Sequence, residues 1–180
     1  MSRQPRGWRA ERELRRQCRS QLRTLGIRMP LDIHDMAARL AEQRGKPIKL
    51  IAAPLPLDGP SGCWLPTKSS DYVWYQQCTT PNRQRQIVLH EFWHMVARHE
   101  ACGVTVPAAM VTLMSNVSAD TVTKMLGRSG YDEGREWAAE AAATIINRWC
   151  ERFERSGAPA YKPHDAGWIE SALEGRPGWL

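Results

Sequence analysis

The sequence contains no apolar run that approaches eighteen residues, so it predicts no membrane-spanning helix. No apolar stretch follows the basic residues 1–10, and we therefore expect no secretory signal. The five cysteines are odd in number and form no C-x-x-C pair, which favours reduced thiols over a disulfide framework or a cysteine zinc site. No internal repeat is visible. These absences together predict a cytoplasmic protein without a membrane partner.

The 180 residues, of which 42% are apolar, are enough for one domain with a sizeable core. Apolar residues spaced by three and four predict helices over residues 11–25, 33–44, 84–99 and 132–151. Two further helices are expected over residues 108–116 and 119–126. Aromatic and β-branched runs predict strands over residues 47–53, 61–65 and 71–77. This order predicts an α+β fold in which a small antiparallel three-stranded sheet packs on helices.

Positive charge is concentrated in the first thirty residues. Nine arginines there oppose Glu11 and Glu13, so the segment carries nine minus two, or +7, and the rest of the chain is close to neutral. An apolar stripe at helical spacing consists of Leu14, Cys18, Leu22 and Leu25. This stripe favours a helix that packs on the body with its arginines in solvent. The alternative is a surface for nucleic acid or an acidic partner.

Residues 90–94 read His-Glu-Phe-Trp-His, an H-E-x-x-H motif inside the predicted helix 84–99. Because positions four apart lie on one helix face, the imidazoles of His90 and His94 can reach one metal ion. Glu91 follows the first histidine closely enough to act as general base on a water at that metal. The pattern is that of a zinc peptidase, which uses Zn²⁺ as its cofactor.

A catalytic zinc usually takes three protein ligands, so a third must come from elsewhere in the chain. One peptidase class continues the motif as x-x-G-x-x-H, but Ala97 and Glu100 occupy those two positions, and His99 is one residue off. The other common solution is a glutamate on a later helix. Glu136 and Glu140 share a face of the predicted helix 132–151, so that one can bind zinc while the other holds a ligand histidine. Spacing alone equally allows both to be surface residues.

Two segments resemble the ImmA/IrrE-type zinc metallopeptidases. Residues 83–94, R-Q-R-Q-I-V-L-H-E-F-W-H, are similar to the family's "R-q-R-f-t-l-a-H-E-l-g-H". Residues 136–143, E-W-A-A-E-A-A-A, are similar to "E-x-x-A-[ND]-x-F-A". The resemblance implies His90, His94 and Glu136 as metal ligands and Glu91 as the catalytic residue. Glu140 then takes the place of the usual Asn or Asp, and Trp93 that of a frequent glycine.

The resemblance covers roughly residues 33–149 and implies a minimal zincin-like domain over 31–155. A basic helix over 1–30 would precede this domain, and an irregular tail over 156–180 would follow it. The implied function is a zinc endopeptidase that cleaves or inactivates a protein partner such as a helix-turn-helix transcriptional repressor. Two alternatives remain: a non-proteolytic regulatory binding protein with a zincin fold, and a nucleic-acid-binding regulator that uses the arginine-rich helix. The sequence contains no recognition motif of a named DNA-binding class.

Peptide hydrolysis also needs a donor for the developing oxyanion. The sequence does not rank the candidates Tyr75, His99, Tyr131 and His164. We expect a peptide substrate to add as a strand at the edge of the sheet, with residues 71–77 as the candidate edge. Trp137 and Trp149, twelve residues apart on one helix, are expected in the core.

Overall fold

The computed structural model describes residues 6–55, 59–97 and 133–156 of the chain. In these ranges the helices are α1 (Arg6–Thr24), α2 (Ile33–Arg44), α3 (Pro81–Val96) and α6 (Glu133–Arg155). The strands are β1 (Ile48–Ala53), β2 (Gly62–Pro66) and β3 (Asp71–Gln76). The α+β class is as expected. The predicted helices 108–116 and 119–126, and the predicted tail from residue 157, lie outside the described residues.

Local sequence signals set the ends of the central helices. Asp32 caps α2 by accepting hydrogen bonds from the backbone N–H groups of His34 and Asp35, and Gly45 ends the helix with a left-handed φ of 69°. Thr80 caps α3 by accepting from the N–H of Arg83, and Pro81 occupies the first turn, where its missing N–H costs nothing. α2 therefore has the predicted bounds, and α3 begins three residues before the predicted start.

The sheet is mixed, so the expectation of an antiparallel sheet is wrong in this respect. β3 lies in the middle, antiparallel to β2 and parallel to β1. After β1, the chain forms β2 at the opposite edge of the sheet. It then returns through a tight turn, and β3 fills the central position between β1 and β2. Hydrophobic alternation does not encode strand direction, which explains the error. Because β3 is paired on both sides, residues 71–77 do not provide the free edge that we expected for a substrate.

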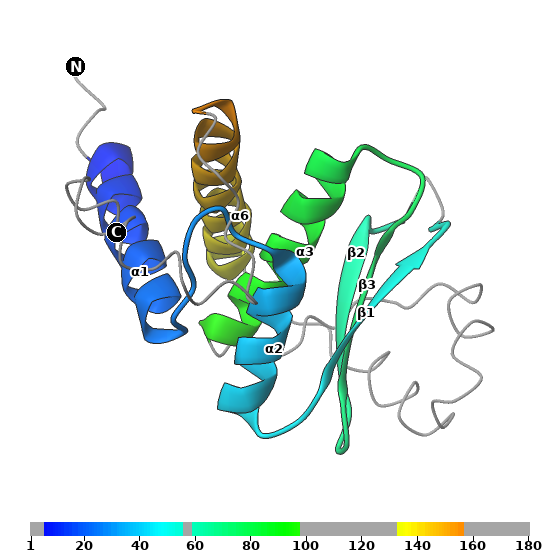
Figure 1. The fold of residues 1–180 in the computed structure, drawn as a ribbon. Helices are drawn as coiled ribbons and strands as arrows, with labels where there is room; N and C mark the ends of the chain where they lie inside the picture. The colour runs from blue at the N-terminus through cyan, green and yellow to red at the C-terminus, as the bar shows by residue number, and fades with distance from the viewer. Residues whose placement is uncertain (1–5, 56–58, 98–132, 157–180) are drawn as a thin grey trace.

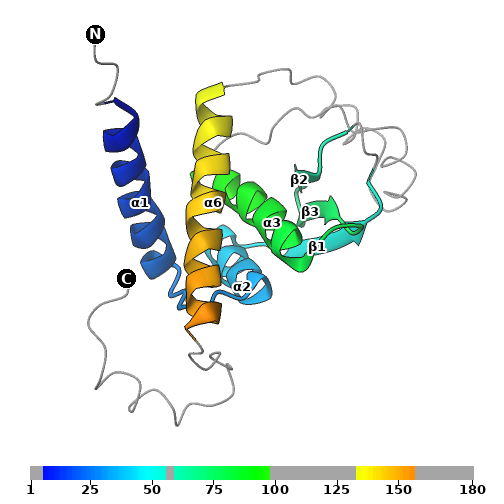
Figure 2. The same cartoon turned by 90° about the horizontal axis from the view of Figure 1, so that it is seen from above.

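The elements form layers, which Figure 1 and Figure 2 show from two directions. α3 packs against β3 and β2 on one side and against α6 on another, while α2 covers β1. α1 contacts α6 and lies on the side of the molecule away from the sheet. None of the helices in the described ranges is long and apolar enough to cross a membrane.

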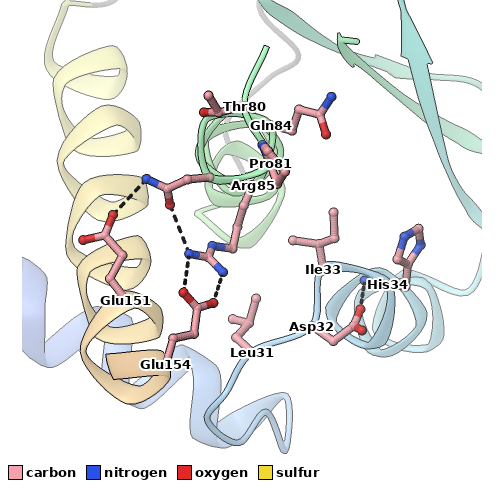
Figure 3. Close-up of a pocket in the computed structure, with 11 residues that line it drawn as sticks. Leu31, Asp32, Ile33, His34, Thr80, Pro81, Gln84, Arg85, Glu151 and Glu154 are labelled. Carbon is pink, nitrogen blue, oxygen red and sulfur yellow. Dashed lines mark hydrogen bonds and ion pairs between the residues drawn. The ribbon is translucent and has the colours of Figure 1, made fainter. Parts of the chain in front are cut away.

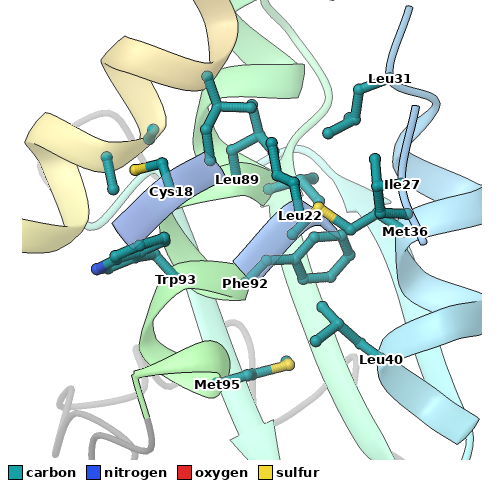
Figure 4. Packing of buried hydrophobic residues seen from close by; sticks show 14 of the residues in the cluster. Cys18, Leu22, Ile27, Leu31, Met36, Leu40, Leu89, Phe92, Trp93 and Met95 are labelled. Carbon is teal, nitrogen blue, oxygen red and sulfur yellow. The ribbon is translucent and has the colours of Figure 1, made fainter. Parts of the chain in front are cut away.

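The main core lies between the helices and the near face of the sheet. Phe92, Leu22 and Leu40 are fully buried there, and Figure 4 shows them converging from three helices. The apolar stripe of α1 is buried in the same cluster, as expected. Trp93 also belongs to this cluster, beside Cys18 of α1, which accounts for a large side chain where the resembling family often has glycine.

Trp137 contradicts the expectation that both tryptophans of α6 lie in the core. Its side chain is 52% exposed, whereas Trp149 is partly buried against the core. Twelve residues correspond to about 120° around a helix, so the two positions do not share a face. Trp137 lies about 160° from the face centred on the fully buried Ala139, which directs its indole away from the core.

A buried ion cluster ties α2 to the start of β3. The Asp71 side chain is fully buried, and its carboxylate lies 2.6 Å from Arg44 Nε and 2.8 Å from Lys46 Nζ. The Lys46 ammonium also donates to the carbonyl of Thr67 at 2.8 Å. A buried carboxylate needs such partners because its desolvation is otherwise costly. The cluster therefore fixes the end of α2 against the turn that joins β2 and β3.

Replacing Asp71 with alanine leaves two partly buried cations without their partner. We expect the free energy of unfolding to fall by about 3–5 kcal/mol, measured by chemical denaturation. Asp35→Ala is the matched control, because the Asp35–Arg39 pair is a partly exposed contact at 3.3 Å and is expected to contribute less than about 1 kcal/mol. Equal losses in the two variants would contradict a structural role for the buried cluster.

Candidate metal centre

The two histidines of the motif lie together on the side of α3 that faces α6. The Nε2 atoms of His90 and His94 are 3.1 Å apart, as expected for positions four apart on one helix face. The His94 side chain is buried, whereas about a fifth of the His90 side chain is exposed. The pair is therefore held in the protein interior but borders solvent.

α6 brings Glu136 to both imidazoles. Glu136 Oε2 lies 3.4 Å from His90 Nε2, and Glu136 Oε1 lies 3.4 Å from His94 Nε2. One ligand atom from each of the three residues can be chosen so that all lie within 4.8 Å of one another. The structure thus gathers the three residues that the resemblance implied as ligands.

Small residues and polar contacts set the position of α6 against α3. Ala139, Ala142 and Ala143 are fully buried, so the two helices can approach closely. Further along the antiparallel pair, Arg85 Nε donates to the buried Asn147 Oδ1 at 2.6 Å. Arg85 also forms an ion pair with Glu154. These contacts fix the register that places Glu136 opposite the two histidines.

The donor atoms lie close enough together to be compared with a zinc site. Ligand atoms at about 2.0–2.1 Å from a tetrahedral zinc lie about 3.3–3.4 Å from one another. The two Nε2 atoms are 3.1 Å apart, and each lies 3.4 Å from a different oxygen of Glu136. With one atom taken from each residue the separations reach up to 4.8 Å, so the side chains would have to close slightly around a bound ion. Two imidazoles and one carboxylate are also a donor set that catalytic zinc sites use, with one position left for water or substrate.

Glu140 lies next to the group and can orient one of its members. Its Oε2 is 3.4 Å from His90 Nδ1, and its Oε1 accepts a hydrogen bond of 2.8 Å from Gln86 Nε2. His90 Nδ1 is buried and has no hydrogen bond in the described part of the chain, so the Glu140 contact is an ion-pair distance rather than an aligned hydrogen bond. A small rotation of either side chain would give the carboxylate–histidine pair that commonly supports a metal ligand.

Glu91 projects from α3 about 100° around the helix from His90 and about 60° from His94, and its carboxylate lies against β2. It is buried, and the backbone N–H of Trp64 in β2 hydrogen-bonds to its carboxylate. Burial, and to a lesser degree the nearby negative charge of Glu136, raise the pKa of Glu91 from 4.5 to about 8, against the lowering effect of the Trp64 bond. The metal-free protein therefore holds this carboxyl protonated at neutral pH.

Gly62 leaves the space that Glu91 occupies. A Cβ atom at this position would lie 2.4 Å from Ile87 Cγ2 and 3.1 Å from Glu91 Oε1. Sequence reasoning missed both Gly62 and the Trp64 N–H, because their roles depend on how β2 packs on α3. The one available signal was a glycine at the start of a predicted strand, which often marks a close approach of backbone and neighbour.

Gly62→Ala is therefore expected to displace Glu91 and the adjoining strand. We expect a loss of about 1–3 kcal/mol in the free energy of unfolding, since the added methyl overpacks a tight contact. Any activity that depends on Glu91 should fall at the same time. Gly7→Ala is the control, because a Cβ there meets nothing within 4 Å. A Gly62→Ala protein with wild-type stability and activity would contradict the tight contact.

Of the oxyanion candidates, Tyr75 alone lies in the described residues; His99, Tyr131 and His164 lie outside them. Tyr75 stands directly across from Gly62 in the β2–β3 ladder and packs partly buried against the main core. Residues directly opposite in a ladder share a face of the sheet, so Tyr75 is on the same side as Glu91.

A separate cleft of about 660 Å³ lies where the starts of α2 and α3 meet the end of α6 (Figure 3). Its polar side chains are engaged with one another: Arg85 pairs with Glu154, Asn82 donates to Glu151, and Asp32 caps α2. The histidine–glutamate group lies further along α3, outside the lining of this cleft.

No protein-family model, curated protein or solved structure matches the chain.

Proposed function

We propose that this chain is a zinc-dependent endopeptidase of the ImmA/IrrE type. Its substrate would be a protein partner such as a helix-turn-helix transcriptional repressor, which it cleaves or otherwise inactivates in the cytoplasm. The observation that carries the proposal is the position of Glu136, within 3.4 Å of both His90 and His94, next to a buried glutamate on the same motif helix. A protein that only binds a partner would need the fold, but it would not need three candidate metal ligands next to a buried glutamate.

His90, His94 and Glu136 would hold the zinc ion, and Glu140 would orient His90. When bound, zinc supplies a Lewis acid that activates water and polarises a carbonyl. Glu91 then accepts a proton at its carboxylate and returns it to the leaving amine. A bound dication would favour the ionised form of Glu91, which is the form that accepts a proton.

The Trp64 N–H positions Glu91 for this role. It is a fixed backbone donor on β2, so it holds the carboxylate in one orientation without needing a second ionisable group. Two elements therefore contribute to the proposed site on α3. α6 would provide the third ligand, and β2 provides the contact that orients Glu91.

The test uses zinc-loaded protein and a library of protein-derived peptides, with new termini identified by mass spectrometry. The wild type should generate cleavage products that Glu91→Gln does not, while both retain one zinc per chain. Co-expression with a helix-turn-helix regulator, followed by its length, then tests the proposed partner. If the wild type and Glu91→Gln give the same termini, the chain is not a peptidase of this mechanism.

A further inference from the structure

The exposed face of α1 carries a continuous row of arginines. Successive members are three or four residues apart, and all five are exposed: Arg9, Arg12, Arg16, Arg19 and Arg23. The row covers fourteen residue steps, or about 21 Å at 1.5 Å per residue. The opposite face of α1 is the buried apolar stripe, so the row cannot turn inward. We call these five residues the arginine row.

Within the described residues, carboxylates leave most of this charge unneutralised. Arg16 pairs with Glu13 at 3.0 Å, but both side chains are more than half exposed, so the pair contributes little. In the described residues no ion pair joins the other four members to a carboxylate. One member also contacts the body of the protein: the guanidinium of Arg19 lies 5.5 Å from the ring centroid of Trp149 in α6. This contact neutralises no charge, so within the described residues the row remains a line of positive charge with few carboxylate partners.

An exposed aromatic ring stands at one end of the row. Trp8 is 62% exposed, and the guanidinium of Arg12 lies 4.8 Å from its ring centroid. This cation–π contact orients the indole while much of its surface remains open. Proteins bind single-stranded nucleic acid with such a combination: cations contact the phosphates of the strand, and bases stack on aromatic rings.

We infer that α1 is a binding surface for single-stranded nucleic acid. The guanidinium groups of the arginine row would contact consecutive phosphates of one strand, and Trp8 would stack on a base. An acidic protein segment would meet the same charge but would have no use for the oriented indole. α1 lies on the side of the molecule away from the sheet, so this surface is separate from the metal centre and does not depend on the proposed peptidase activity (Figure 1).

The experiment measures binding of a labelled single-stranded oligonucleotide to the full chain by fluorescence anisotropy over a range of salt. Five phosphate contacts predict a slope of about −3.5 in log affinity against log salt, or about a 100-fold loss between 50 and 200 mM salt. Arg9→Gln, Arg16→Gln and Arg23→Gln combined should reduce the slope by about two. A control that removes three exposed positive charges elsewhere combines Lys49→Gln, Lys68→Gln and Arg83→Gln, and it should keep the wild-type slope.

Trp8→Ala tests the stacking and should weaken single-strand binding about tenfold. Thermal melts of each variant confirm that the fold is intact, since all the substituted residues are exposed. Three results would overturn the inference: no binding at low salt, equal losses in the two triple variants, or binding of duplex DNA or polyglutamate as tight as that of the single strand. Binding unaffected by Trp8→Ala would likewise contradict it.

Discussion

Glu136→Gln is expected to lower zinc affinity more than any other single change in α6. A carboxylate with an oxygen 3.4 Å from each histidine Nε2 atom would supply one of the three proposed ligands, and the neutral amide is a poorer donor to a dication. We expect a loss greater than about 100-fold, because that is the upper range for changes to outer partners of a metal site. The measurement is zinc affinity by competition with a chelator.

Two other glutamates of α6 provide comparisons for the loss of zinc affinity expected in Glu136→Gln. Glu140→Gln disturbs the partner of His90 and should cost about 10- to 100-fold in zinc affinity. Glu133→Gln changes an exposed residue at the start of the helix and should leave the affinity unchanged. The expected order of loss is therefore Glu136, then Glu140, then Glu133. A larger loss for Glu140→Gln than for Glu136→Gln would mean that the two residues exchange roles when zinc binds.

Much of this site is readable from local sequence. The spacing of His90 and His94 specifies one helix face, whereas only the resemblance of residues 136–143 singled out Glu136, because spacing alone did not separate it from Glu140. The caps at Asp32 and Thr80 define helix starts because a side-chain oxygen must satisfy the first free N–H groups. These are signals that act over three or four residues, so a sequence displays them without knowledge of the fold.

Other features depend on contacts between distant segments. Asp71 is matched by Arg44 and Lys46 only because β3 returns beside the end of α2. The parallel pairing of β1 with β3 depends on which side β2 takes, and no residue pattern states this. The contact of Glu91 with Gly62 and Trp64 likewise exists only once β2 packs on α3. The sequence therefore indicated the candidate ligands, but it did not indicate the contacts that surround Glu91.

Glu91→Gln is expected to abolish most activity and at the same time to stabilise the metal-free protein. Loss of a general base typically costs about 10²–10⁴-fold in rate. The stability effect follows from the pKa of Glu91, which is raised from 4.5 to about 8 by burial and by the charge of Glu136. Between these values the folded chain binds a proton that the unfolded chain has released, so the stability of the wild type falls as pH rises.

Glutamine cannot ionise, so the variant lacks this pH-dependent loss. The stability difference between Glu91→Gln and the wild type should grow from about pH 4.5 to pH 8, and its upper limit is about 5 kcal/mol at 1.36 kcal/mol per pKa unit. Chemical denaturation in the presence of a chelator measures it, and Glu133→Gln corrects for the loss of one negative charge on the surface. Parallel pH profiles for the two proteins would show that Glu91 is ionised in the fold, and the burial argument for its role as a proton carrier would then fail.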